Sequence, residues 1–186
     1  MSNVTVKVIQ DMHPSNPRTE WDNLGTMACW HGRYELGDEQ PNQDPEEWIK
    51  ENVPKGSVVL PLFLLDHSGI TMSTGSFGDP WDSGQVGIIF ATPEQIREAY
   101  MVKRITKATR AKVEACLKSE VEVYDHYITG SVWGYVIEKH SECDSCGHAE
   151  PELIDSCFGF YGYDIEGMVD HAGEEYREQL VAAAPF

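Results

Sequence analysis

The sequence predicts an α+β fold, with a mostly antiparallel sheet of about five to seven strands, two longer helices and one or two short ones. Three observations support this class: short apolar runs of strand length, turns rich in glycine and proline, and two long stretches with helical spacing of apolar residues. With 186 residues, of which 41% are hydrophobic, the chain can bury a core, so we expect a single domain over residues 1–186.

The expected strands are short and apolar. They occupy residues 4–9, 26–34, 58–65, 86–91, 131–140 and 152–162. Pro61 interrupts the third run, which indicates an edge position, a bulge or a strand start. The chain is expected to run out along residues 70–73, turn through a glycine-rich loop, and return along residues 86–90.

The helices follow from apolar spacing and from capping residues. A short helix is expected at residues 45–53, opened by Pro45, and a second begins with the capping-box sequence at residues 92–95. The two longer helices are expected at residues 107–127 and 164–183, because apolar residues recur there every three or four positions.

The strongest compositional signal is the net charge of −17. Such a chain repels nucleic acid and anionic membranes, so we expect neither as a direct partner and favour a basic protein. The sequence lacks a signal-peptide pattern and a long apolar run, and its five cysteines lack the spacing of a disulfide framework. These observations predict a cytoplasmic protein; the oligomeric state stays open.

The charges are unevenly distributed. Residues 97–118 hold seven basic and two acidic residues, whereas residues 120–186 hold fifteen acidic and two basic ones. In the predicted last helix, four acidic residues recur at every fourth position: Glu166, Asp170, Glu174 and Glu178. At about 1.5 Å rise per residue their carboxylates lie about 6 Å apart, near the spacing of consecutive phosphates. The alternatives are an ordinary solvated helix face, or acidity that serves salt adaptation or solubility.

A compact group of metal-ligand residues lies between the last two strands. His140, Cys143, Cys146 and His148 form the pattern H-x2-C-x2-C-x-H in an expected hairpin-tip insertion, residues 139–151. Zinc prefers such ligands, but structural zinc sites usually draw their second ligand pair from a separate turn or helix. The sequence therefore allows two interpretations of this segment. It binds zinc, in which case zinc is the only cofactor that the sequence indicates, or it is a hairpin tip whose thiols are free.

The glycine-rich stretch between residues 66 and 87 offers two further candidates. Trp81, flanked by Asp79 and Asp82, has the chemistry of an interface anchor, unless it packs flat on the core. A metal-dependent enzyme could instead use Asp66, His67, Asp82 and Gln85 around a cleft. No nucleophile elbow, Walker loop, dinucleotide fingerprint or metalloprotease pattern is present, so the residues favour binding over catalysis.

The patterns LLDHSGI, PWDSGQVG and DSCFGFYG add a resemblance. Over roughly residues 55–163 the chain resembles a family of small phage and mobile-element proteins for which no activity is settled. The residues that carry it are Asp66, His67, Ser68, Gly69, Trp81, Asp82, Ser83, Gly84, Gln85 and Gly87. The resemblance implies provenance more than mechanism, and the CxxC insertion is peculiar to this chain.

Three functional hypotheses follow. The first is an acidic inhibitor that binds a host nucleic-acid-processing defence protein, such as a restriction, CRISPR or repair protein, through the acidic residues of the last helix. A DNA mimic is one form of this hypothesis. The second is the small metal-dependent enzyme with its site near residues 66–87. The third is an accessory or structural phage protein.

Overall fold

The computed structural model describes residues 3–142 and 149–183, and these residues confirm the α+β class. They divide into two compact units. The four-stranded unit is the continuous segment Asn16–Thr129, and the three-stranded unit combines the described parts of Met1–Ser15 and Gly130–Phe186. The sequence predicts one domain, whereas each of these units has a hydrophobic core of its own.

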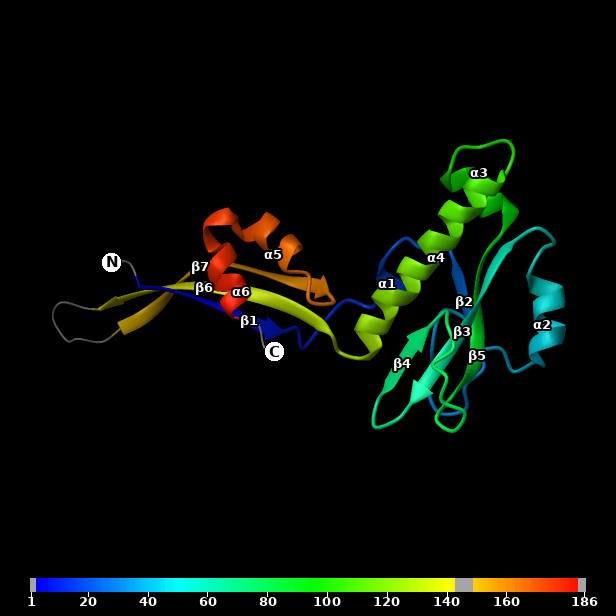
Figure 1. Ribbon diagram of the computed structural model, residues 1–186, viewed down its shortest axis with the longest axis horizontal. Helices are drawn as coiled ribbons and strands as arrows, with labels where there is room; N and C mark the ends of the chain where they lie inside the picture. Colours follow the sequence, from blue (N-terminus) through cyan, green and yellow to red (C-terminus); the bar gives the residue numbers. More distant parts are fainter. Residues whose placement is uncertain (1–2, 143–148, 184–186) are drawn as a thin grey trace. The chain divides into compact units, whose positions relative to one another are not determined.

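The sheet of the four-stranded unit has the order β2-β5-β3-β4, and all neighbouring strands are antiparallel (Figure 1). Its members are β2 (Thr26–Cys29), β3 (Val58–Asp66), β4 (Ile70–Ser73) and β5 (Ser83–Ala91). The return strand expected after β4 is present, but it pairs with β3 instead of β4. The start of β5 therefore lies beside the end of β3.

Pro61 shows why β3 tolerates a proline. On one side β3 pairs with β5 along its length, but on the other side β4 pairs only with Phe63 and the three residues after it. Pro61 therefore lies where β3 is an edge strand, and the register with β5 shifts between Leu62 and Phe63. Of the three alternatives that the sequence gives for Pro61, the edge position is confirmed.

Helices cover both faces of this sheet (Figure 1). The long helix α4 (Lys107–Ile128) lies on one face and α2 (Pro45–Asn52) on the other, with α1 (Pro17–Glu20) and α3 (Pro93–Ala99) at the margins. The helix predicted at residues 107–127 is confirmed, and so is the capping box at the start of α3. Four buried side chains join α4 to the sheet core: Val113, Leu117, Val121 and Tyr124.

The three-stranded unit is an antiparallel sheet with the order β1-β6-β7, with helices packed on one face (Figure 1). Its strands are β1 (Asn3–Gln10), β6 (Val132–Glu142) and β7 (Ala149–Tyr161). Its helical segments are α5 (Ile165–Ala172), the 3-10 turn η1 (Glu174–Tyr176) and α6 (Arg177–Ala182). Met168, Val169 and Leu180 from these helices pack on Tyr135 and Ile137 of β6.

The single helix predicted at residues 164–183 is wrong, because Gly173 interrupts it. Gly173 has φ 108° and ψ 148°, a conformation that is essentially restricted to glycine. The chain then restarts as η1 and α6. The four acidic residues expected on one helix are therefore divided between α5, η1 and α6.

In the described part of the chain, none of the helices combines the length and the apolar character that a membrane crossing needs.

Candidate functional site

Polar side chains gather at the end of the four-stranded sheet, where β3 ends and β5 begins. The Arg33 guanidinium donates to the Asp66 carboxylate over 2.9 Å, and the Tyr34 hydroxyl donates to it over 3.5 Å. The backbone N–H of Asp66 donates to the carbonyl oxygen of Asp82 over 2.8 Å. The end of β3 is thereby connected to the segment after β2 and to the residue before β5.

His67 and Asp82 form the second contact of this cluster. Nδ1 of His67 lies 2.6 Å from Oδ2 of Asp82. The turn before β5 places Asp82, because the Asp79 carboxylate accepts hydrogen bonds from the backbone N–H groups of Asp82 and Trp81. These two hydrogen bonds lower the pKa of Asp79, since they stabilise its charged form.

The contact between His67 and Asp82 is suited to proton transfer. When Nδ1 of His67 carries the proton, it donates a hydrogen bond to Asp82. Nε2 of the neutral imidazole can then accept a proton from another group. The His67 side chain is 71% exposed, so water competes for the same position. Burial raises the pKa of the Cys29 thiol to about 12, which disfavours the reactive thiolate near neutral pH.

Three of the four residues in the enzyme hypothesis thus belong to one cluster. Asp66 and His67 follow each other at the end of β3, and Asp82 contacts both of them. Gln85 differs: its side-chain amide donates to the carbonyl oxygen of Gly87, and it lines a cavity that includes none of the other three.

The Trp81 loop presents a large apolar side chain to solvent. Trp81 is 91% exposed, so the alternative in which it packs flat on the core does not hold. The Asp79 carboxylate accepts the backbone N–H of Trp81, and the Asp82 carboxylate contacts His67. A large exposed aromatic side chain is the kind of residue expected of an interface anchor.

Most of the predicted zinc ligands lie outside the described residues. His140 lies on β6, whereas Cys143, Cys146 and His148 lie outside the residues that the structure describes. Within the described ranges, 3–142 and 149–183, no group of three or more His, Cys, Asp or Glu side chains is placed to hold a metal ion.

The predicted acidic row is replaced by a cluster around one arginine. Arg177 donates to both carboxylate oxygens of Glu166 over 2.7 and 2.9 Å, and to the Glu174 carboxylate over 2.5 Å. Its charge and hydrogen bonds lower the pKa of Glu166. Asp170 and Glu178 are exposed and have no cationic partner among the described residues.

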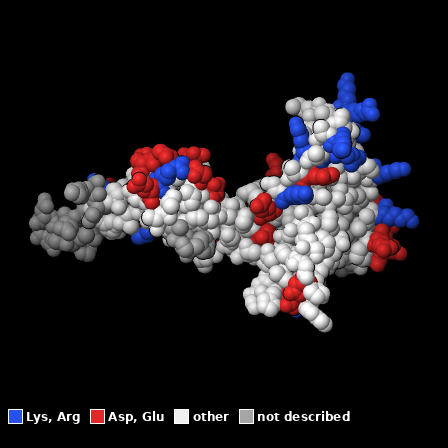
Figure 2. Space-filling model, in the orientation of Figure 1, with Lys and Arg blue, Asp and Glu red and all other residues white. Residues whose placement is uncertain are grey.

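The charges gather on separate elements. Figure 2 shows acidic side chains together over α5 and α6, and basic side chains together over α3 and the adjoining part of α4. The sequence of the three-stranded unit holds thirteen acidic and three basic residues, and that of the four-stranded unit holds eighteen and eleven. The surplus of negative charge is thus densest in the smaller unit.

One buried ionic cluster was not found from the sequence. The Arg18 side chain is only 2% exposed, and it donates to the carboxylates of Asp38 and Glu120 and to the carbonyl oxygen of Gly25. Both carboxylates also accept backbone N–H groups, Asp38 from Met27 and Glu120 from residues 24 and 25. The three ionic residues are far apart in the sequence and share no motif, so no local signal could have found them.

Comparisons with protein-family models, curated proteins and solved structures gave no match.

Proposed function

We propose that this protein is an acidic binding protein of a phage or mobile element, which binds and inhibits a cationic nucleic-acid-processing protein of the host. The observation that carries the proposal is the concentration of negative charge in the three-stranded unit, with thirteen acidic against three basic residues. A surface of one charge sign attracts partners of the opposite sign and accelerates their association.

Contact is proposed through the C-terminal acidic surface, which comprises Glu166, Asp170, Glu174 and Glu178. Within this set, Asp170 and Glu178 matter most, because the side chain of Arg177 partly neutralises the other two. The proposal depends on charge density and not on phosphate-like spacing, since Gly173 interrupts the regular row. The exposed Trp81 loop offers an apolar anchor for the same partner.

Charge reversal tests this proposal. The partner is captured from host lysate at low salt, identified, purified and titrated with the wild type and with the double variant Asp170→Lys/Glu178→Lys. Binding should weaken steeply as salt is raised, and excess duplex DNA should displace the protein from its partner. The double variant should bind at least about tenfold more weakly, because two attractive contacts become repulsive.

A matched control separates a local contact from overall charge. Asp22→Lys/Glu98→Lys makes the same change in net charge at exposed positions of the four-stranded unit. Equal weakening by both double variants would show that overall charge alone drives binding. An affinity for the partner that changes neither with salt nor in either double variant would contradict the proposal.

A small enzyme is the second candidate function, favoured by the 2.6 Å contact between His67 and Asp82. In this role His67 would act as general base, oriented by Asp82. Ester and phosphoester substrates can be screened with the wild type and His67→Gln. A turnover that His67→Gln abolishes and that Asp82→Asn reduces would support catalysis, whereas equal rates in all three proteins would exclude it.

A further inference from the structure

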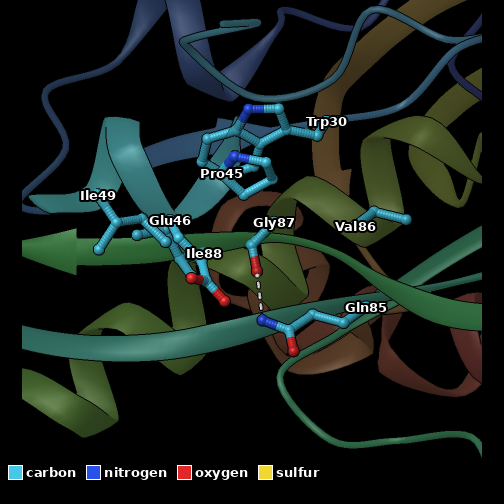
Figure 3. A pocket seen from close by; sticks show the side chains of 8 residues that line it. All are labelled: Trp30, Pro45, Glu46, Ile49, Gln85, Val86, Gly87 and Ile88. Carbon is cyan, nitrogen blue, oxygen red and sulfur yellow. Dashed lines mark hydrogen bonds between the residues drawn. The ribbon is translucent and has the colours of Figure 1, made fainter. Parts of the chain in front are cut away.

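A cavity of about 350 Å³ lies between α2 and β5 in the four-stranded unit (Figure 3). Trp30 forms one wall, Pro45, Glu46 and Ile49 of α2 form another, and Gln85 with residues 86–88 of β5 forms the floor. This volume is sufficient for one long side chain or a small ligand. None of the residues in the polar cluster at the end of β3 lines it.

Trp30 is held in place from several sides. Its indole N–H donates to the carbonyl oxygen of Gln43 over 3.1 Å, and its backbone N–H donates to the carbonyl oxygen of Val86 over 2.7 Å. Its ring meets the ring of Trp48 edge to face, with centroids 5.5 Å apart. The indole lines the cavity, and its only hydrogen-bond donor is already used.

The polar groups left in the cavity are acceptors. The Gln85 amide nitrogen donates to the carbonyl oxygen of Gly87 (Figure 3), and its side-chain oxygen has no hydrogen bond among the described residues. Glu46 supplies the only charged side chain of the lining, and among the described contacts its carboxylate has no partner. An aromatic ring beside a carboxylate and an amide oxygen excludes anions and suits a cation that carries several N–H donors.

The surroundings of the cavity strengthen this preference. Residues 35–51, which lead into α2 and include most of it, hold seven acidic residues and only one basic residue, Lys50. The resulting negative field attracts cations toward the cavity. A guanidinium group is planar, stacks on an indole and carries five donors, so it fits this lining better than a lysine ammonium does.

We infer that this cavity binds an arginine side chain of a cationic partner protein. The inference rests on the proposed function for the source of the arginine, but it concerns a different unit and a different set of residues. In the complex, the guanidinium lies on the Trp30 ring and donates to the Glu46 carboxylate and to the side-chain oxygen of Gln85.

Short peptides test the site directly. The ¹⁵N-labelled full-length protein is titrated with Ac-Gly-Arg-Gly-NH2, and with peptides that carry citrulline or norleucine in place of arginine. The arginine peptide should shift the signals of Trp30 and Gln85 in a saturable manner. Citrulline keeps the shape of arginine without its charge, so it should bind at least about tenfold more weakly.

Variants of adjacent residues give the matched control. Glu46→Gln should weaken binding of the arginine peptide roughly two- to fivefold, and Trp30→Leu by a similar factor. Glu47→Gln removes the neighbouring charge of α2 from outside the lining, so it changes only the surrounding field and should weaken binding clearly less than Glu46→Gln does. The backbone signals of each variant establish that the unit is folded.

Two outcomes would overturn the inference: equal shifts with the norleucine peptide, which indicate an apolar occupant, or no saturable shift with any peptide. Neither outcome would affect the proposed function, whose test uses Asp170 and Glu178 of the other unit. Conversely, if binding of the host partner does not depend on Asp170 and Glu178, the result of the peptide titration is unaffected.

Discussion

Arg18 illustrates the cost of a single buried charge. Its side chain is almost fully buried, and the side chains of Asp38 and Glu120 are only 23% and 12% exposed. Removing such charges from water is expensive, and the mutual attraction and the backbone hydrogen bonds of the cluster offset that cost. The cluster joins α1, α4 and the segment around β2, so its loss would affect the whole four-stranded unit.

We therefore expect Arg18→Met to reduce the free energy of unfolding by about 3–5 kcal/mol, because two partly buried carboxylates lose their counter-ion. Urea unfolding followed by tryptophan fluorescence measures this loss. Arg33→Met removes an arginine from an exposed pair with Asp66 and should cost much less, because an exposed ion pair contributes little to stability. Equal losses in the two variants would contradict a structural role for the buried cluster.

Glu166 provides a prediction about pH. The hydrogen bonds and charge of Arg177 hold its pKa in the folded protein below the ordinary value of 4.5. Its contribution to stability is therefore complete above that value and is lost as the pH falls through the lower, folded pKa. NMR titration of the Glu166 carboxyl group should show a low midpoint that rises in Arg177→Gln. Lys7→Gln removes a cation that pairs with Glu138 and should leave the midpoint unchanged. A rise in both variants would exclude a specific pair.

Single residues were predictable where the chemistry was local. The sequence places Asp66, His67 and Asp82 in one glycine-rich stretch, and the structure brings them into contact. The exposure of Trp81 could not be decided from the sequence, since the same tryptophan can anchor an interface or pack on a core. The partners of Arg18 lie 20 and 102 residues away, and no local pattern encodes that pairing.

Among the elements, the break between α5 and α6 shows the limit of periodicity. Met168, Val169 and Leu180 keep helical spacing across Gly173, and all three are buried as predicted. An interrupted helix can present the same apolar positions as a continuous one, so the pattern does not reveal the break. A glycine inside a helix also lowers its stability only modestly, so Gly173 does not argue against the continuous helix that the spacing predicts.

We expect Gly173→Ala to destabilise the protein by about 1–3 kcal/mol, because alanine is strained at the observed backbone angles. Thermal unfolding followed by circular dichroism measures the change. Gly32→Ala is the control, since a methyl group there meets no atom within 4 Å and the backbone angle is ordinary. A stabilised Gly173→Ala variant with increased helicity would mean that α5 and α6 can join into one helix.

At the scale of the whole molecule, the sequence predicts the fold class but not the division of the chain into two compact units. Alternation and helical spacing identified most strands and helices, because these patterns are local. The pairing of β1 with β6 joins residues more than a hundred positions apart, and no periodic signal indicates it. The two separate sheets and their separate cores follow from such long-range pairings.

The continuous segment Asn16–Thr129 should therefore fold when expressed alone, since it contains its own sheet, its helices and its core. We expect a dispersed NMR spectrum and a cooperative urea transition. The same fragment with Arg18→Met should be much less stable and serves as the control. A fragment without a cooperative transition would indicate that the chain behaves as one domain, as the sequence predicts.

The connection between the units has a consequence for synthesis. The chain leaves the three-stranded unit and returns to it at neighbouring points, where the backbone N–H of Asp11 donates to the carbonyl oxygen of Val132. On the ribosome β1 is made before its partner β6, which emerges only after the whole of Asn16–Thr129, a delay of roughly ten seconds at ordinary translation rates. During that interval β1 lacks its native partner, so Asn16–Thr129 can reach its native state before the three-stranded unit does.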